Sequence, residues 1–294
     1  MIIATRDRWQ QLARCLDSVA RLEFDRPWEL IVVDNGSTDA TAEVVKQFAD
    51  KAPIPFRCIF ELEPGLGNAH NAGIKTARGE ILAFTDDDCY PETDFLRGIW
   101  CAFADPSIGY IAGRITLHDP ADYPMTTIEA TIPYTFRPRR LVSAGTFGGA
   151  NMAFRRKVLV EIGGFDPLFG PGALFNAEDV DAAARASAIG WKGEYRPEVI
   201  VKHHHGRRAA DIPRLLKSYG MGTGAYQMKL LLEGREFLWF ARSVYQARRR
   251  FRASRRSVLW EPVGALKYAY VYLTRTLRRR WFALSHERPA GPIE

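Results

Sequence analysis

The chain has 294 residues, a net charge of +7 and 47% hydrophobic residues, which is enough apolar material to bury the core of a large α/β domain and excludes a largely disordered protein. Four cysteines are scattered without C-x-x-C spacing, so we expect neither a zinc site nor a disulfide framework, and we expect a reducing, cytosolic compartment. No apolar run approaches the ~18 to 20 residues of a membrane-spanning helix. No signal-peptide pattern is found either, so we expect neither a spanning segment nor export by that route.

The charge is unevenly distributed along the chain. Residues 206–294 carry 19 Lys and Arg against 6 Asp and Glu, whereas residues 1–205 carry 22 against 28. The basic character therefore belongs to the C-terminal part, and we predict two domains, a folded domain over 1–205 and a basic helical extension over 206–294.

The first part of the chain alternates between strand and helix patterns. Short apolar runs predict strands at 1–4, 28–33, 56–60 and 80–85, and helical stripes of apolar residues predict helices at 9–20, 42–48 and 69–77. Alternation of this kind favours parallel pairing, so we predict an α/β fold with a Rossmann-like, mostly parallel central sheet flanked by helices. Ligands of such sheets bind beyond the carboxyl ends of the strands.

The strand predicted at 80–85 runs directly into three carboxylates, Asp86, Asp87 and Asp88. Adjacent charges repel one another, so a folded protein keeps such a cluster mainly where a cation neutralises it. Alternate residues of an extended chain face the same way, and we therefore expect Asp86 and Asp88 to face one divalent ion while Asp87 faces elsewhere. The alternative is a solvated acidic turn that caps the next helix.

Two further polar clusters follow predicted strands, the turn 34–39 that begins with Asp34 and the loop Gly65-x-Gly67. We expect both clusters and the three carboxylates to form one site at one edge of the sheet. The glycine pair lacks the third glycine and the acidic partner of a dinucleotide fingerprint, and the chain contains no P-loop motif, so neither of those nucleotide sites is expected.

Residues 119–142 contain four prolines and little periodicity, and we expect this insertion to shape a pocket or lid. Gly149 and Asn151 lie in a small-residue segment that leads into a strand. Glycine lets the backbone approach a ligand closely, and Asn151 offers both a donor and an acceptor. A β-bulge with a satisfied asparagine explains the same segment.

Glu178 and Asp179 open a helical segment, and three histidines, residues 203–205, follow a strand predicted at 192–201. Carboxylates in a first helical turn are favoured by the macrodipole, but a second acidic cluster also suggests a catalytic role. His203 and His205 would share a face, and neutral imidazole is a competent ligand for a metal such as Mn²⁺.

Taken together, residues 1 to about 205 resemble the family 2 inverting glycosyltransferases of the GT-A fold. The resemblance rests on the order and spacing of these motifs: Val32 to Asp39, Gly65 to Asn71 with Gly73, Phe84 to Asp88 with Pro91, Gly149 to Arg155, Gly163 to Asp166, and Glu178-Asp179.

The resemblance implies transfer of a sugar from a nucleotide-diphosphate sugar, expected to be a UDP-sugar, to a hydroxyl of a glycan or lipid-linked acceptor, with Mn²⁺ or Mg²⁺ as cofactor. A role in polysaccharide biosynthesis at the cell envelope is the corresponding expectation. We assign Asp179 as general base with Glu178 orienting it or the acceptor, donor contacts to Thr5, Asp34, Gly65, Asp86 and Asp87, acceptor contacts to Gly149 and Asn151, and metal ligands to Asp88, Asp86 and His203.

This assignment agrees with the chemistry expected of the side chains. Departure of a nucleoside diphosphate leaves negative charge that a divalent ion at Asp88 stabilises. The attacking hydroxyl loses a proton as it bonds, and a carboxylate such as Asp179 can accept it.

The C-terminal extension carries a helical stripe of apolar residues among basic ones. The stripe consists of Val263, Leu266, Tyr270, Leu273, Leu277 and Trp281, and the segment from Phe237 to Phe251 has a similar aromatic and basic character. Such helices are suited to an anionic membrane surface, so we expect a protein peripheral to the cytoplasmic face of the membrane. Packing of these helices on the catalytic domain is the alternative.

Three rival functions remain open. A nucleic-acid-binding protein would explain the basic tail but not the acidic sheet edge. A catalytically silent module that binds sugar nucleotides is separated from an enzyme only by turnover. A sugar nucleotidyltransferase is disfavoured because its glycine- and arginine-rich N-terminal phosphate loop is absent.

Overall fold

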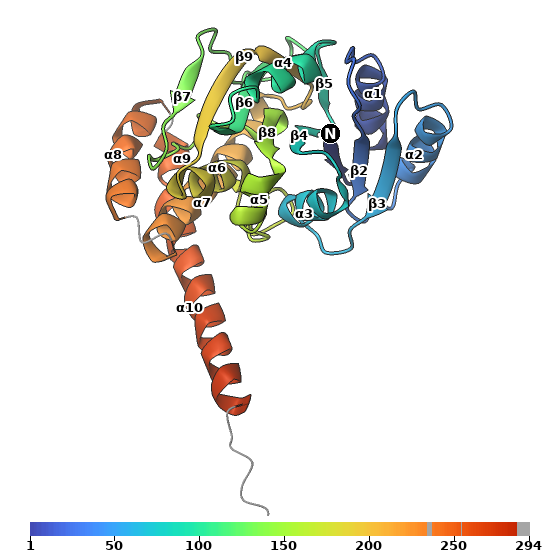
Figure 1. The fold of residues 1–294 in the computed structure, drawn as a ribbon. Coiled ribbons are helices and arrows are strands. Elements are labelled where there is room, and N and C mark those ends of the chain that lie inside the picture. The colour runs from blue at the N-terminus through green and yellow to red at the C-terminus, as the bar shows by residue number, and fades with distance from the viewer. Residues whose placement is uncertain (234–236, 254, 287–294) are drawn as a thin grey trace, which may run out of the picture. The chain divides into compact units, whose positions relative to one another are not determined.

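The computed structural model describes residues 1–233, 237–253 and 255–286, with side chains over 1–233, 237–247 and 256–278 (Figure 1). The chain divides into two compact units, Met1–Leu215 and Leu216–Glu294. The division lies beyond residue 205, because the backbone of Arg207 is hydrogen-bonded to Tyr123 and Arg208 is ion-paired to Asp119.

The first unit is built on one mixed sheet flanked by helices. Its strands are β1 (Ile2–Thr5), β2 (Leu30–Asp34), β3 (Phe56–Phe60), β4 (Ile81–Asp86), β5 (Cys89–Pro91), β6 (Ile108–Leu117), β7 (Tyr134–Phe136), β8 (Met152–Arg155) and β9 (Lys192–His203). Its helices are α1 (Trp9–Val19), α2 (Thr41–Ala49), α3 (Leu66–Thr76), α4 (Phe95–Ala102), α5 (Arg156–Glu161) and α6 (Glu178–Ala188). The described strands are ordered β3-β2-β1-β4-β8-β6-β9-β5, and β7 pairs with β9.

The directions of these strands place several carboxyl ends at one edge. β1 to β4 are parallel as predicted, β8 runs antiparallel between β4 and β6, and β9 is parallel to β6. The register sets Thr5 opposite Asp34, and Ala4 opposite Asp86. Since β9 ends at this edge and β5 begins there, His203 lies opposite Cys89.

The central strands are covered on both faces, which is why they are continuous apolar runs without alternation. Ile3 and Val32 belong to the core on the face of α1 and α4, together with Leu12 and Phe95. On the other face α3 packs so closely that a Cβ on Gly73 would lie 2.6 Å from Ile2 Cγ2. The small residues of α3 therefore serve this close packing.

Helix α3 begins at Leu66 rather than at Ala69 as predicted. The reason is a tertiary contact: Leu66 N donates to Pro171 O at 2.9 Å, and the backbone of Gly67 packs on the loop 166–173. Gly65 precedes the helix with φ +118°, a conformation that favours glycine. Gly65 and Gly67 thus let the start of α3 pack closely against the loop 166–173.

The second unit is helical. It contains most of α7 (Ile212–Leu232), with α8 (Phe237–Ala253), α9 (Arg255–Val258) and α10 (Glu261–His286). The backbones of α7 and α10 almost touch, because a Cβ on Gly224 would lie 1.8 Å from Glu261 O and one on Gly264 would lie 1.9 Å from Met221 O. Among the described residues, none of the helices has the length and apolarity needed to cross a membrane.

Replacement of Gly67 by alanine tests the packing of the glycine loop. Alanine normally stabilises a helix more than glycine does. Here, however, the added Cβ would lie 2.9 Å from Asp166 O and 3.1 Å from Phe169 O. We expect Gly67→Ala to lower the free energy of unfolding by about 1 to 3 kcal/mol, the usual range for overpacking.

Chemical denaturation measures this effect, with Gly79→Ala as the control. A Cβ on Gly79 meets only Ile81 O, at 3.4 Å, so this variant should keep the stability of the parent protein. Equal stability of the two variants would contradict the packing role of Gly67.

Candidate active site

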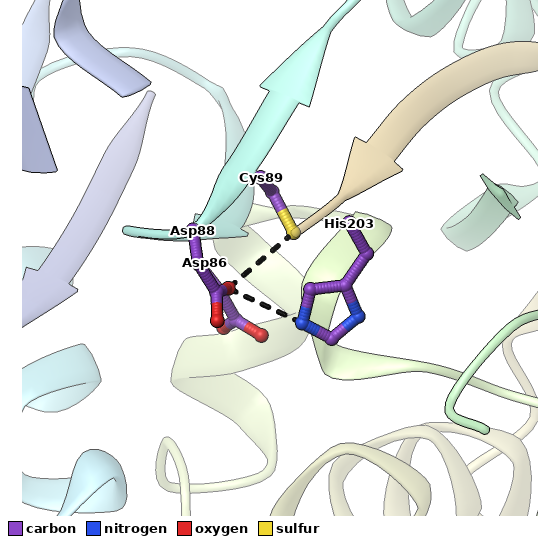
Figure 2. A group of neighbouring side chains, drawn as sticks. All are labelled: Asp86, Asp88, Cys89 and His203. Carbon is purple, nitrogen blue, oxygen red and sulfur yellow. Dashed lines mark hydrogen bonds and ion pairs between the residues drawn. The ribbon is translucent and has the colours of Figure 1, made fainter. Parts of the chain in front are cut away.

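Four side chains converge at the sheet edge where β4 and β9 end and β5 begins. Asp86 ends β4, Asp88 and Cys89 follow in the turn and at the start of β5, and His203 ends β9. Their ligand atoms all lie within 4.8 Å of one another (Figure 2). The structure thus brings together the three predicted metal ligands and adds Cys89, which the sequence analysis did not single out.

Asp88 is held from two sides. Its Oδ1 lies 3.2 Å from His203 Nε2, and its other oxygen is ion-paired with Arg8. Asp87 faces away from this cluster as expected. It accepts a hydrogen bond of 2.7 Å from the Thr5 hydroxyl and pairs with Arg8 Nε at 3.0 Å.

Arg8 therefore joins two of the three carboxylates, and sequence reasoning missed it. The available signal was its place in the polar loop directly after the first strand, a loop that the topology carries to the carboxyl edge. Its guanidinium forks match carboxylate oxygens, which explains how one side chain serves both residues.

The pKa values of the three carboxyls diverge. Burial acts to raise the pKa of Asp88, but the hydrogen bond and charge of His203, together with Arg8, lower it to about 2. Burial raises the pKa of Asp87 to about 7, and burial and the charge of Asp88 raise that of Asp86. A cation would relieve this unbalanced charge, so the buried oxygen donors with one imidazole fit Mn²⁺ or Mg²⁺.

At the end of β2, Asn35 connects two of the residues predicted to contact the donor, Asp34 and Gly65. Asp34 is buried and its Oδ1 accepts a hydrogen bond of 2.8 Å from Ser37 N. Asn35 donates to Glu61 O and accepts from Gly65 N at 2.9 Å. Asn35 therefore fixes the glycine loop to the end of β2, a role that the turn sequence alone did not indicate.

Glu178 and Asp179 begin α6 and form the second acidic group. The two oxygens of Asp179 accept hydrogen bonds from Gly149 N at 2.8 Å and Val180 N at 2.7 Å. A Cβ on Gly149 would lie 3.3 Å from Glu178 Oε1. Glycine at this position lets the backbone reach both carboxyls.

Burial raises the pKa of Asp179 to about 6 against the two backbone hydrogen bonds that lower it, and the charge of Asp86 adds to the rise. Burial, followed by the charge of Asp179, raises the pKa of Glu178 well above its usual value. The negative charge of Asp86 thus raises the pKa of both Glu178 and Asp179. Asp179 is a carboxylate that can take up a proton near neutral pH.

Asn151 lies in the 3₁₀ turn Gly149–Asn151 just before β8 and is almost fully buried. Its amide nitrogen donates to Arg114 O and Val199 O, both at 2.9 Å. These bonds connect β6 and β9, so the side chain has a structural use whatever contact it makes with an acceptor.

His205 does not join His203 at the metal cluster. Its side chain is buried against Asp122, with Nδ1 3.6 Å from Oδ2. The two histidines share a face as expected, with ring centroids 5.1 Å apart, but only His203 lies among the four clustered ligand atoms.

Comparisons with known proteins identify the family of the chain. Residues 1–163 match the family description "Glycosyl transferase family 2". The chain is 26% identical over 282 residues to glycosyltransferase AglE of Haloferax volcanii, covering 95% of this chain and 84% of that protein. It is 26% identical over 216 residues to the O-antigen chain rhamnosyltransferase RfbN of Salmonella typhimurium, covering 70% of this chain and 66% of that protein.

Another curated relative is matched over a smaller share of its length. The chain covers 54% of an uncharacterized glycosyltransferase of Nostoc sp., to which it is 28% identical over 175 residues.

Solved structures share the fold. The mannosyltransferase PcManGT of Pyrobaculum calidifontis, in complex with GDP-Man and Mn²⁺, superposes with a TM-score of 0.64 at 21% identity, over 98% of this chain and 80% of that chain. Residues 1–349 of S. aureus TarS in complex with UDP-GlcNAc give a TM-score of 0.61 at 16% identity, over 83% and 70% of the two chains. The family match covers more than half of the sequence, and the chain therefore belongs to glycosyl transferase family 2, as a glycosyltransferase of the GT-A fold.

Proposed function

We propose that this enzyme transfers a sugar, with inversion, from a nucleotide-diphosphate sugar to a hydroxyl of a glycan or lipid-linked acceptor, with Asp179 as general base. The observation that carries the proposal is the environment of Asp179. This carboxyl is fixed by two backbone N–H groups, has a pKa of about 6 and lies within the electrostatic influence of Asp86. A base held in this way beside a donor site suits proton transfer from an attacking alcohol.

On the donor side, Asp34 would contact the nucleobase of the sugar nucleotide. Thr5, Gly65, Asp86 and Asp87 would line the remainder of the nucleotide. Supporting this, Asp34, Thr5 and Asp86 end neighbouring strands at one edge, and Asn35 holds Gly65 to the same edge. The neighbours PcManGT and TarS are solved with GDP-Man and UDP-GlcNAc, and we propose a UDP-sugar as donor.

Asp86, Asp88 and His203 would hold a divalent cation, Mn²⁺ or Mg²⁺. When bound, such an ion stabilises negative charge on the departing nucleoside diphosphate. The chain contributes the orientation of its ligands: Arg8 and His203 hold the two oxygens of Asp88.

On the acceptor side, Gly149 and Asn151 would border the attacking hydroxyl. Its oxygen bonds to the anomeric carbon as the bond from that carbon to the diphosphate oxygen breaks, and its proton passes to Asp179. Attack from the face opposite the leaving group inverts the anomeric centre. Glu178, whose raised pKa favours its neutral form, could donate a hydrogen bond that orients the acceptor or Asp179.

We further propose that the enzyme is peripheral to the cytoplasmic face of the membrane and acts in polysaccharide biosynthesis at the cell envelope. The support lies in α10, where five residues of the predicted stripe are 43% to 70% exposed: Val263, Leu266, Tyr270, Leu273 and Leu277. Exposed Lys267, Arg275 and Arg278 belong to the same helix. An exposed apolar stripe with basic neighbours suits an anionic interface.

The side chains of Trp281 and Phe251, which the sequence analysis included in these helices, lie outside the described residues. The stripe of α10 does not depend on them. Opposite it, Gly264 packs against α7, and the buried Tyr268 donates a hydrogen bond to Glu233 just after α7, so the helix has one packed and one exposed face.

Replacement of Asp179 by asparagine tests the general base. The amide keeps the size of the side chain and one of its two backbone hydrogen bonds but cannot accept the proton, so we expect transfer to fall by a factor on the order of 10² to 10⁴ while donor affinity is retained. Steady-state transfer and calorimetric donor binding measure the two effects, with exposed Glu198→Gln as a control for loss of one carboxylate. Near-normal turnover of Asp179→Asn would place the base elsewhere, and a parent protein that binds donor without turnover would favour a silent binding module.

The pH dependence of transfer follows from the raised pKa of Asp179. Below its pKa of about 6 the carboxyl is protonated and cannot accept the acceptor proton, and above it the carboxylate is ionised. We therefore expect kcat/KM to rise with pH through about 6 and to level above it. A kcat/KM that is constant between pH 5 and 8 would contradict this assignment. So would an Asp179→Asn variant whose kcat/KM still rises through about pH 6.

Substitutions in the α10 stripe test membrane binding. We expect the double variant Leu266→Gln, Leu273→Gln to lose sedimentation with phosphatidylglycerol vesicles, because it removes exposed apolar surface without touching the packed face. Binding of the parent protein should weaken as salt screens the basic residues. Leu62→Gln, which changes a side chain 84% exposed in the first unit, is the matched control, and equal sedimentation of both variants with the parent would refute the proposal.

A further inference from the structure

The segment 118–126, which includes the start of the proline-containing insertion, is connected to residues 203–208, at the end of β9 and in the loop after it. His118 N donates to His203 O at 3.0 Å, and Tyr123 N donates to Arg207 O at 2.9 Å. This segment therefore contacts the backbone of the first histidine of the run and that of Arg207 beyond the run. These contacts hold the chain that carries His203 into the metal cluster.

Asp122 is the centre of this connection, and its side chain is fully buried. Its Oδ2 accepts a hydrogen bond of 3.0 Å from Gly206 N, and its Oδ1 lies 3.1 Å from Arg208 Nη1. Oδ2 also lies 3.6 Å from His205 Nδ1. A buried carboxylate is costly unless it is paired in this way, so Asp122 requires the loop to keep the conformation that presents Gly206 N and Arg208.

Thr126 contacts His203 directly. Its hydroxyl donates to Met125 O, and the same oxygen lies 3.3 Å from His203 Nδ1. A threonine hydroxyl has one proton, so toward the imidazole it acts as an acceptor and Nδ1 carries the hydrogen. The other ring nitrogen, Nε2, lies 3.2 Å from Asp88 Oδ1. Without a cation it carries a hydrogen toward that carboxylate, and a cation held by Asp88 would take the place of this hydrogen.

The backbone of Thr126 supports a functional reading. It has φ +61°, in the left-handed region that a β-branched residue rarely adopts. Such strain persists where surrounding contacts impose it, and it gathers at functional sites. Here it places the hydroxyl against His203.

We propose that Asp122 and Thr126 are positioning residues of the metal site: Asp122 holds the loop 203–208, and Thr126 fixes the tautomer of His203 so that Nε2 faces the cation. The inference rests on the proposed role of His203 as a metal ligand. Residues in contact with metal-ligating histidines commonly orient the ring and set its tautomer, and their loss costs about 10-fold to 100-fold in metal affinity.

The test measures Mn²⁺ affinity of the full chain from the electron paramagnetic resonance signal of free Mn²⁺. We expect Thr126→Val and Asp122→Asn to weaken binding about 10-fold to 100-fold, while Thr126→Ser, which keeps the hydroxyl, stays within about 2-fold of the parent. Asp119→Asn is the matched control, because Asp119 lies in the same segment and pairs with the same Arg208 but is more exposed.

A second readout separates positioning from general stability. In metal-free protein, ¹H–¹⁵N spectra of the imidazoles should show a hydrogen on Nδ1 of His203 as well as on Nε2, and the Nδ1 signature should be lost in Thr126→Val and kept in Thr126→Ser. If Asp122→Asn does not fold, the two Thr126 variants decide the proposal. Unchanged Mn²⁺ affinity in Thr126→Val would overturn it.

His203→Ala distinguishes this failure from failure of the proposed function. If His203→Ala weakens Mn²⁺ binding but Thr126→Val and Asp122→Asn do not, His203 is a ligand and the positioning proposal is wrong. If His203→Ala also leaves Mn²⁺ affinity unchanged, the ligand assignment fails and the positioning proposal fails with it.

Discussion

The structure depends on how three neighbouring carboxylates are tolerated at the end of a buried strand. Asp86, Asp87 and Asp88 follow an apolar strand and are largely removed from water, so each must find a cation or a proton. Arg8 and His203 supply positive charge to Asp88, and Thr5 adds a hydrogen bond to Asp87. The cost of burying charge thus explains why residues from β1, β4, β5 and β9 converge at one edge.

The same electrostatics gives the two acidic groups different pKa values. In the first cluster, His203 and Arg8 lower the pKa of Asp88 to about 2, which keeps it ionised and ready to hold a cation. At the start of α6, burial raises the pKa of Asp179 to about 6, which makes this carboxyl a proton acceptor near neutral pH. The neighbours of each carboxyl thus suit Asp88 to the proposed role of ligand and Asp179 to that of base.

The helical unit shows the opposite use of apolar residues. The glycines of α7 and α10 bring two backbones together, and Tyr268 is buried in this packing. The apolar stripe of α10 remains exposed on the other side of the helix. A helix with two apolar faces can satisfy one of them within the unit and keep the other for a surface outside it.

The sequence by itself determined the α/β class, the parallel first four strands and the chemistry-bearing residues that lie next to strand ends. Local patterns suffice there, because an apolar run followed by carboxylates or glycines predicts both the strand and the polar edge. The alternation of side chains along the chain likewise predicted that Asp87 faces away from Asp86 and Asp88.

Only the tertiary structure decided which distant groups complete the site. Arg8 reaches Asp88 from a loop 80 residues earlier in the chain, Asn35 and Gly65 meet across 30 residues, and Thr126 contacts His203 across 77. These pairings follow from strand order and from the antiparallel insertion of β8, which no local periodicity encodes. For the same reason the sequence left Asn151 open between a ligand contact and a satisfied asparagine, whereas the fold uses its amide between β6 and β9.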